Sequence, residues 1–118
     1  MSDNNREKGS RYEERAAAFL ENEGMTILAR NYRTKAGEID IIAKDSDGTL
    51  VFVEVKFRAN LRTGWPAEAV GSNKQARIFR AAQWYMKQYK IYGGRMRFDV
   101  VSVLGGEITH IKNAFGGF

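Results

Sequence analysis

Hydrophobic residues recur along the chain with two different periods, which indicate where helices and strands lie. Over 11–22 and again over 73–90, the apolar residues return at the spacing of one helix face. Ser10 and Ser72 stand where N-caps are expected, and Gly24 stands where a left-handed residue ends the first helix. The pattern therefore predicts two amphipathic helices.

Five shorter segments are rich in β-branched and aromatic residues, which is typical of strands. The predicted strands span 25–33, 37–43, 50–58, 97–104 and 107–112. Turn-forming residues over 44–49 join the second strand to the third, and Gly105 and Gly106 join the fourth to the fifth. The order α-β-β-β-α-β-β predicts an α/β fold, with a mixed five-stranded sheet flanked by helices and the second helix as a crossover.

The chain has 118 residues, which is the length of one ordinary domain. We expect a single domain over 1–118, in which residues 1–8 form a loose polar arm. Residues 59–71 contain the only proline and are predicted to form a loop directly after the strongest strand.

Polar residues interrupt two of the apolar strands. In LVFVEVKFR, over 50–58, Glu54 and Lys56 share one face because side chains alternate along a strand. In GEIDIIA, over 37–43, the same alternation predicts Ile39 and Ile41 on one face and Asp40 on the other. A turn centred near 46–47 places Asp40 opposite residue 53 or 54, so we expect its carboxylate beside that of Glu54.

Two adjacent carboxylates repel each other and need a compensating cation. Mg²⁺ or Mn²⁺ suits oxygen ligands of this kind. Such an ion polarises a phosphate and helps to generate hydroxide, while Lys56 would orient the water or stabilise the developing charge. The alternative is a solvated sheet face with an ordinary salt bridge. The apolar neighbours of Asp40 and Glu54 favour the metal site, because buried charges are costly without a purpose.

Composition narrows the function classes further. The formal net charge is +5, which suits a polyanionic partner such as nucleic acid, although many small proteins are this basic without one. The absence of cysteine excludes disulfides and thiolate zinc sites, and the single His110 excludes a two-histidine zinc site. The polar residues 1–8 are unlike a signal peptide, and the apolar runs are short. We expect a cytoplasmic protein without a membrane partner.

The sequences GEID and EVK, which contain Asp40, Glu54 and Lys56, resemble the PD-(D/E)xK nuclease superfamily, although no proline precedes the first acid. This superfamily is also called restriction-endonuclease-like and includes archaeal Holliday-junction resolvases. Over nearly its whole length the chain resembles the bacterial YraN family. This wider resemblance rests on Gly9-Ser10, Glu13, Ala16, Leu20, Gly24, Asn31-Tyr32-Arg33, Gly37-Glu38-Ile39-Asp40, Glu54-Val55-Lys56, Lys74, Arg97-Phe98-Asp99-Val100-Val101, Ile111 and Ala114-Phe115.

The resemblance implies a restriction-endonuclease-like core with Asp40 and Glu54 as metal ligands and Lys56 as the catalytic lysine. It also implies Glu13 as a carboxylate that approaches the metal from the first helix. Helical spacing places Glu13 at the edge of the apolar stripe and Glu14 away from it. An ordinary acid favoured by the helix dipole is the alternative role for Glu13.

Other polar residues are candidates for nucleic-acid contacts. Trp65 could stack on an unpaired base or pack its loop onto the domain. Asp99 lies in an apolar strand and is expected to pair with Arg97 or Arg58 rather than with the metal. The candidate phosphate contacts, which could also be solvated surface residues, are Arg58, Arg62, Lys74, Gln75 and Arg77.

Together these patterns and the resemblance predict a metal-dependent endonuclease that hydrolyses phosphodiester bonds in branched or structured DNA, with DNA expected over RNA. A homodimer would match the two-fold character of such a substrate. One alternative is a non-catalytic nucleic-acid-binding or adaptor protein on the same fold. Another is a structural protein whose hairpin charges form a salt bridge.

Overall fold

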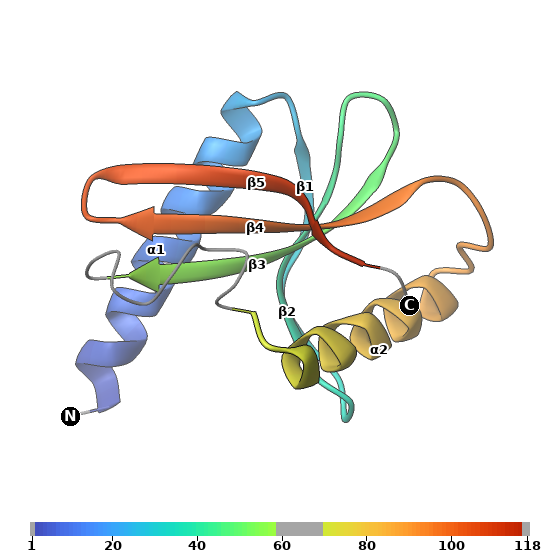
Figure 1. The fold of residues 1–118 in the computed structure, drawn as a ribbon, viewed down its shortest axis with the longest axis horizontal. Helices are drawn as coiled ribbons and strands as arrows, with labels where there is room; N and C mark the ends of the chain where they lie inside the picture. Colours follow the sequence, from blue (N-terminus) through green and yellow to red (C-terminus); the bar gives the residue numbers. More distant parts are fainter. Residues whose placement is uncertain (1, 59–69, 117–118) are drawn as a thin grey trace.

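The fold has three layers, in which a five-stranded sheet carries one helix on each face (Figure 1). The computed structural model describes residues 2–58 and 70–116. The two helices are α1 (Ser2–Asn22) and α2 (Ser72–Gln88). The strands are β1 (Thr26–Arg33), β2 (Glu38–Lys44), β3 (Leu50–Arg58), β4 (Met96–Leu104) and β5 (Glu107–Phe115).

Neighbours in the sheet follow the order of the sequence, from β1 to β5. The β3–β4 pair is parallel and the other three pairs are antiparallel, so α2 is the crossover that a parallel pair requires. The predicted element order and the mixed five-stranded sheet are therefore confirmed. Among the described residues, no helix has both the length and the apolar character needed to cross a membrane.

Apolar side chains fill the space on both faces of the sheet. Phe52 and Phe98 pack against Ile78 and Tyr85 on the α2 face. Val51 and Leu20 belong to the cluster on the α1 face. Because adjacent residues of β3 enter opposite clusters, the continuous apolar run in this strand reflects burial on both sides.

Helix α1 begins much earlier than the sequence pattern predicts. It starts at Ser2, so the expectation of a loose arm over 1–8 and an N-cap at Ser10 is wrong. The segment over 2–10 is polar in sequence, and Arg6, Glu7 and Lys8 are residue types with good helix propensity. Apolar periodicity does not register such a polar extension.

The end of α1 follows the prediction. Gly24 has a φ of +94°, in the left-handed region that favours glycine. The N–H of Gly24 donates to the carbonyl of Glu21, and the N–H of Met25 donates to that of Leu20, both at 3.0 Å. This pair of bonds is the Schellman arrangement, which satisfies the last carbonyls of the helix.

Helix α2 begins without a side-chain cap. Gly71 is the N-cap residue with an extended backbone, and Ser72 is the first residue of the helix, so the expected cap by Ser72 is wrong. The backbone N–H of Gln75 donates to the Gly71 carbonyl at 2.9 Å. Its side-chain Nε2 donates to the carbonyl of Val70 at 2.8 Å. Gln75 therefore holds the chain at the start of the helix.

The β2–β3 hairpin has the register expected from its turn, but its ladder stops early. The last pair is Ile41 with Val53, and continuing that register would set residue 40 opposite residue 54. Ile39 packs in the α2-side cluster and Ile41 in the α1-side cluster, so the prediction that they share a face is wrong. The strands part at Asp40, because its carboxylate takes the Val55 N–H in place of a backbone carbonyl. We call this place the β2/β3 fork.

Candidate functional site

Asp40 lies at the β2/β3 fork, where its Oδ2 accepts a 2.8 Å hydrogen bond from the backbone N–H of Val55. Burial raises the pKa of Asp40 to about 7, and the negative charge of Glu54 adds to that rise. The Val55 hydrogen bond acts in the opposite direction and is too weak to cancel either cause. Asp40 is therefore a carboxyl group that holds its proton close to neutral pH.

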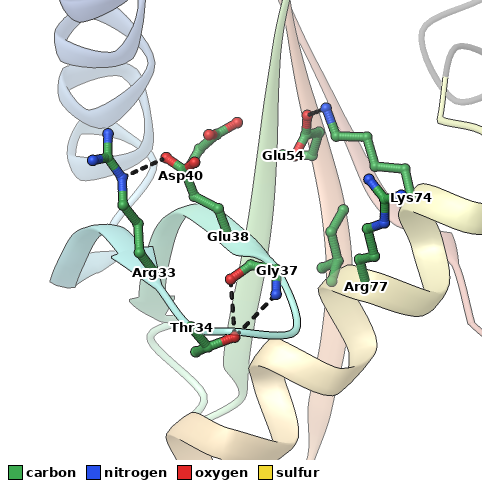
Figure 2. Close-up of a pocket in the computed structure, with 9 residues that line it drawn as sticks. Arg33, Thr34, Gly37, Glu38, Asp40, Glu54, Lys74 and Arg77 are labelled. Carbon is green, nitrogen blue, oxygen red and sulfur yellow. Dashed lines mark hydrogen bonds and ion pairs between the residues drawn. The ribbon is translucent and has the colours of Figure 1, made fainter.

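Glu54 extends from β3 toward α2 and is only 4% exposed. Its Oε1 lies 2.5 Å from Nζ of Lys74 and 3.8 Å from Nζ of Lys56. Figure 2 shows Lys74 reaching from α2 to Glu54, with Asp40 and Glu38 across the cleft. The sequence suggested Lys74 as a phosphate contact, whereas the structure places it on a carboxylate of the site.

The two lysines influence each other directly, and both also lie near the Glu54 carboxylate. Burial lowers the pKa of Lys56, and the positive charge of Lys74 lowers it further. Burial also opposes the charge of Lys74, but its hydrogen bond and attraction to Glu54 outweigh that effect and raise its pKa. Lys56 is therefore the lysine of the site that gives up its proton more readily.

Glu13 lies on α1 and is partly buried, while Glu14 is exposed, as helical spacing predicts. Burial raises the pKa of Glu13, and a hydrogen bond with the Asn31 side chain and the charge of Arg30 oppose that rise. The Arg30 guanidinium is 3.9 Å from the Glu13 carboxylate. The charge of Glu13 also contributes to the raised pKa of Asp40, so both groups act at the same fork.

The fork opens into a cleft of about 530 Å³ between the β1–β2 turn and α2. Asp40 and Glu54 line it together with Lys74, Arg77 and Arg33. Glu38 lines it as well, so three carboxylates share one opening with three cationic side chains. Two of these cations are already paired, Arg33 with Glu38 and Lys74 with Glu54.

Close backbone contact closes one end of the cleft. A Cβ added to Gly37 would lie 2.8 Å from the backbone oxygen of Arg77, so only glycine allows α2 to approach the β1–β2 turn this closely. Thr34 organises the same turn, because its Oγ1 accepts the N–H of Ala36 at 3.1 Å and that of Gly37 at 3.0 Å. Gly37 therefore sets the spacing between the turn and α2.

The acidic residues near the fork are candidates for holding a hard divalent cation. Asp40, Glu54 and Glu13 supply carboxylate oxygens, the ligand type that Mg²⁺ and Mn²⁺ prefer. Besides burial, repulsion from the Glu54 and Glu13 carboxylates raises the pKa of Asp40. A bound cation would relieve this repulsion. In the described part of the chain, no three acidic or histidine side chains are gathered closely enough to hold a metal as they stand. The Lys74 ammonium instead neutralises Glu54.

The other residues that the sequence suggested as nucleic-acid contacts do not all lie at the cleft. Arg77 lines the cleft, whereas Gln75 is bonded to the Val70 carbonyl and does not line it. Arg62, Trp65 and the side chain of Arg58 lie outside the described residues.

Asp99 is fully buried in β4 and forms a separate polar cluster. Its carboxylate lies 3.0 Å from Nε of Arg97 and 2.7 Å from Nε2 of His110, and it accepts the Asn113 N–H at 2.9 Å. Burial alone would raise the pKa of Asp99, but these hydrogen bonds outweigh it and lower the pKa. The predicted pairing with Arg97 is confirmed, and Asp99 does not line the cleft.

Sequence reasoning missed two charged residues of the cleft, Arg33 and Glu38, which form an ion pair at 3.5 Å. They flank a turn in which Thr34 stands three residues before Gly37. That spacing is a recognisable turn signal and could have identified the turn. It does not indicate that the turn packs against a helix that begins at Ser72.

Comparison with known proteins identifies close relatives of this chain. Residues 12–103 match the family described as "Uncharacterised protein family UPF0102". A UPF0102 protein of Desulfosudis oleivorans is 48% identical over 117 residues, covering 98% of this chain and 94% of the relative. A UPF0102 protein of Persephonella marina is 44% identical over 108 residues, covering 92% of each chain.

Solved structures show more distant similarity. A repair endonuclease from Pyrococcus abyssi is 21% identical with a TM-score of 0.43, and the match covers 75% of this chain and 36% of that one. The EndoMS chain of an EndoMS–dsDNA2 complex is 24% identical with a TM-score of 0.35, and the match covers 65% of this chain and 27% of that one. The resemblance to the YraN family is confirmed by the sequence matches: the chain belongs to the uncharacterised protein family UPF0102.

Proposed function

We propose that this protein is a metal-dependent nuclease that hydrolyses phosphodiester bonds at the β2/β3 fork. The observation that carries the proposal is the pair of Asp40 and Glu54, two carboxylates that line one open cleft with Lys74, Arg77 and Arg33. Glu54 is a buried carboxylate, and the pKa of the neighbouring Asp40 is raised to about 7. Burying two such acids together costs folding free energy, which a purely structural role does not explain. A role in binding a cation and a phosphate accounts for that cost.

In this proposal Asp40 and Glu54 hold Mg²⁺ or Mn²⁺, and Glu13 approaches from α1 as a third carboxylate. When bound, such an ion neutralises phosphate charge and lowers the pKa of a bound water. Asp40 would hold the cation as a carboxylate, because a positive charge beside it would lower its raised pKa. Glu54 would hold the cation in place of its ion pair with Lys74, and the Lys74 ammonium would then be available to a phosphate oxygen.

Lys56 is the proposed positioning group for the attacking water. Its lowered pKa makes the neutral amine more accessible, so that it can accept a hydrogen bond or a proton from water. In its ammonium form it stabilises the negative charge that develops on the phosphate. Arg77 and Arg33, which also line the cleft, hold the neighbouring phosphates of the same strand.

For the substrate we propose DNA of branched or otherwise structured form. The support is the resemblance of the GEID and EVK segments to the PD-(D/E)xK nucleases, which include Holliday-junction resolvases. The net charge of +5 agrees with a polyanionic partner. A homodimer would present two such clefts to a two-fold substrate.

One observation favours a second candidate, a non-catalytic nucleic-acid-binding protein on the same fold. Lys74 and Lys56 lie within 2.5 and 3.8 Å of Glu54, so the site has a cation partner without any metal. On this alternative the lysines neutralise the acids permanently and the basic cleft binds phosphate only.

A cleavage panel separates the two candidates. Purified protein is incubated with single-stranded, duplex, flap and four-way DNA and with matched RNA forms, in Mn²⁺ and in EDTA, while binding is followed in parallel. A nuclease cuts at least one form in Mn²⁺ and none in EDTA. Salt-sensitive binding without cleavage of any form would instead establish the second candidate.

A further inference from the structure

Trp84 is a large aromatic residue on the outer face of α2, and 54% of its surface is exposed. It forms part of two adjoining hollows. One has a volume of about 670 Å³ and lies between α2 and the β1–β2 turn, where Lys35 and Gln88 also line it. The other has a volume of about 330 Å³ and is lined in part by Arg80 and Lys87. The Trp84 ring therefore lies at the meeting point of two open surfaces.

The charge around Trp84 has one sign. Helix α2 has no acidic residue in its 17 positions, while Lys74, Arg77, Arg80 and Lys87 all lie on it. Across 11–57 and 70–116, where the structure describes side chains, no ion pair involves Arg80, Lys87 or Lys35. These three cations are exposed and available to an anionic partner.

The surface around Trp84 is held in place by contacts between α2 and β1. The hydroxyl of Tyr32 donates a 2.7 Å hydrogen bond to the side-chain oxygen of Gln88. The Tyr32 ring also packs edge-to-face on Tyr85, with centroids 5.3 Å apart. A ligand that binds beside Trp84 therefore meets a preformed surface and loses little free energy in ordering it.

The surface around Trp84 continues from the proposed catalytic cleft. Arg33 and Thr34 line both the cleft that holds Asp40 and the larger hollow beside Trp84. Lys74, on the other side of the cleft, is ten residues before Trp84 on the same helix, about 15 Å along its axis. A strand bound at the fork therefore reaches Trp84 within a few nucleotides.

We propose that Trp84, with Arg80, Lys87 and Lys35, binds an unpaired DNA strand next to the catalytic cleft. A base stacks on the exposed indole, and the phosphates on either side pair with the three cations. Exposed aromatic rings interleaved with unpaired cations are the usual means of holding single strands without reading their sequence. This inference rests on the proposed function, because it assigns the substrate a single-stranded segment beside the cut.

The test measures binding in EDTA, so that cleavage is not required. Anisotropy of a labelled duplex with a thymidine tail is compared with that of the same duplex with blunt ends. Wild type is expected to prefer the tailed form. Trp84→Ala is expected to lower its affinity for the tail about 5- to 100-fold, with blunt-duplex binding unchanged. Trp84→Phe keeps a stacking ring and is expected to retain most of the preference.

Two further variants make the assignment specific. Tyr92 is 83% exposed and lines neither hollow, so Tyr92→Ala is expected to bind like wild type. Replacing Arg80 and Lys87 together with glutamine is expected to reduce the slope of log affinity against log salt by about 1.4, which corresponds to two lost phosphate contacts. All variants are first required to melt at the wild-type temperature.

The proposal is overturned if wild type shows no tail preference, or if Trp84→Ala and wild type bind both DNA forms equally well. It is also overturned if Trp84→Ala converts a dimer to a monomer by light scattering while tail binding is kept, since the surface would then join two copies of the chain. If tail binding depends on Trp84 but no substrate is cleaved, the proposed nuclease activity is refuted and the Trp84 binding surface is kept. Cleavage with no effect of Trp84→Ala on tail binding would refute this inference alone.

Discussion

The Lys74 ammonium lies 2.5 Å from the carboxylate of Glu54, a side chain that is only 4% exposed. This ion pair joins α2 to β3 across the cleft and supplies the cation that the two acids of the fork require. A divalent ion that binds Glu54 would have to displace the Lys74 ammonium. Several consequences can be measured.

Removing Lys74 leaves the buried Glu54 with only the more distant Lys56, at 3.8 Å. Lys74→Met is therefore expected to lower the free energy of unfolding by about 1–2 kcal/mol in EDTA. Mn²⁺ is expected to raise the melting temperature of this variant more than that of wild type, because no ammonium has to be displaced. Thermal unfolding in EDTA and in Mn²⁺ measures both effects.

Lys87→Met is the matched control, since it removes a lysine from the same helix that forms no ion pair with the described residues. It is expected to unfold like wild type in both conditions. If Lys74→Met is as stable as Lys87→Met in EDTA, the ion pair does not stabilise the fork and this interpretation of Lys74 fails.

Asp40 should make the metal-free protein less stable as pH rises. The folded protein keeps the Asp40 proton up to a pKa of about 7, whereas an unfolded aspartate loses it near pH 4. Between these values the folded state binds more protons, so stability falls as pH increases and becomes constant above about pH 7. The loss attributable to Asp40 is about 2–4 kcal/mol.

Chemical denaturation in EDTA at a series of pH values tests this directly. Asp40→Asn keeps an oxygen that can accept the Val55 N–H and removes the titrating group, so its stability is expected to decline less across the same window. Glu14→Gln, an exposed change on α1, serves as the control. Parallel pH profiles for wild type and Asp40→Asn would show that Asp40 does not hold its proton as described.

Gly37 sets the spacing between the β1–β2 turn and α2. Because a Cβ at this position would lie 2.8 Å from the backbone oxygen of Arg77, Gly37→Ala must displace the helix or the turn. We expect a loss of about 1–3 kcal/mol in unfolding free energy, together with slower cleavage, since Lys74 and Arg77 move relative to Asp40. Denaturation and initial cleavage rates measure the two effects.

Gly93→Ala gives the comparison, because an added Cβ there meets no atom within 4 Å. It is expected to leave cleavage unchanged and to alter stability by less than about 1 kcal/mol. Equal stability and equal cleavage in the two variants would contradict the role given to Gly37.

Local rules were sufficient for much of the hairpin. Turn residues over 44–49 predict residue 40 opposite residue 53 or 54, and extending the observed register beyond its last pair, Ile41 with Val53, reaches residue 54. Helical spacing likewise separates the partly buried Glu13 from the exposed Glu14. Each of these features depends on residues close together in sequence, where period and turn chemistry are informative.

Features that depend on distant contacts were not predictable in this way. The break in alternation at Asp40 depends on a hydrogen bond to Val55 of the next strand. The place of Lys74 depends on how α2 crosses the sheet, which the apolar stripe of that helix does not specify. The sequence showed which residue types were present at the fork, and packing determined which of them met.

The most direct test of the proposed active site is the cleavage rate of Lys56→Met in Mn²⁺, measured on the form of DNA that wild type cuts fastest. Lys44→Met, which removes an exposed lysine, is purified in parallel to exclude a contaminating nuclease. Lys56→Met is expected to cleave about 100-fold or more slowly than wild type while binding the same DNA with similar affinity. Cleavage by Lys56→Met at the wild-type rate would contradict the proposed active site.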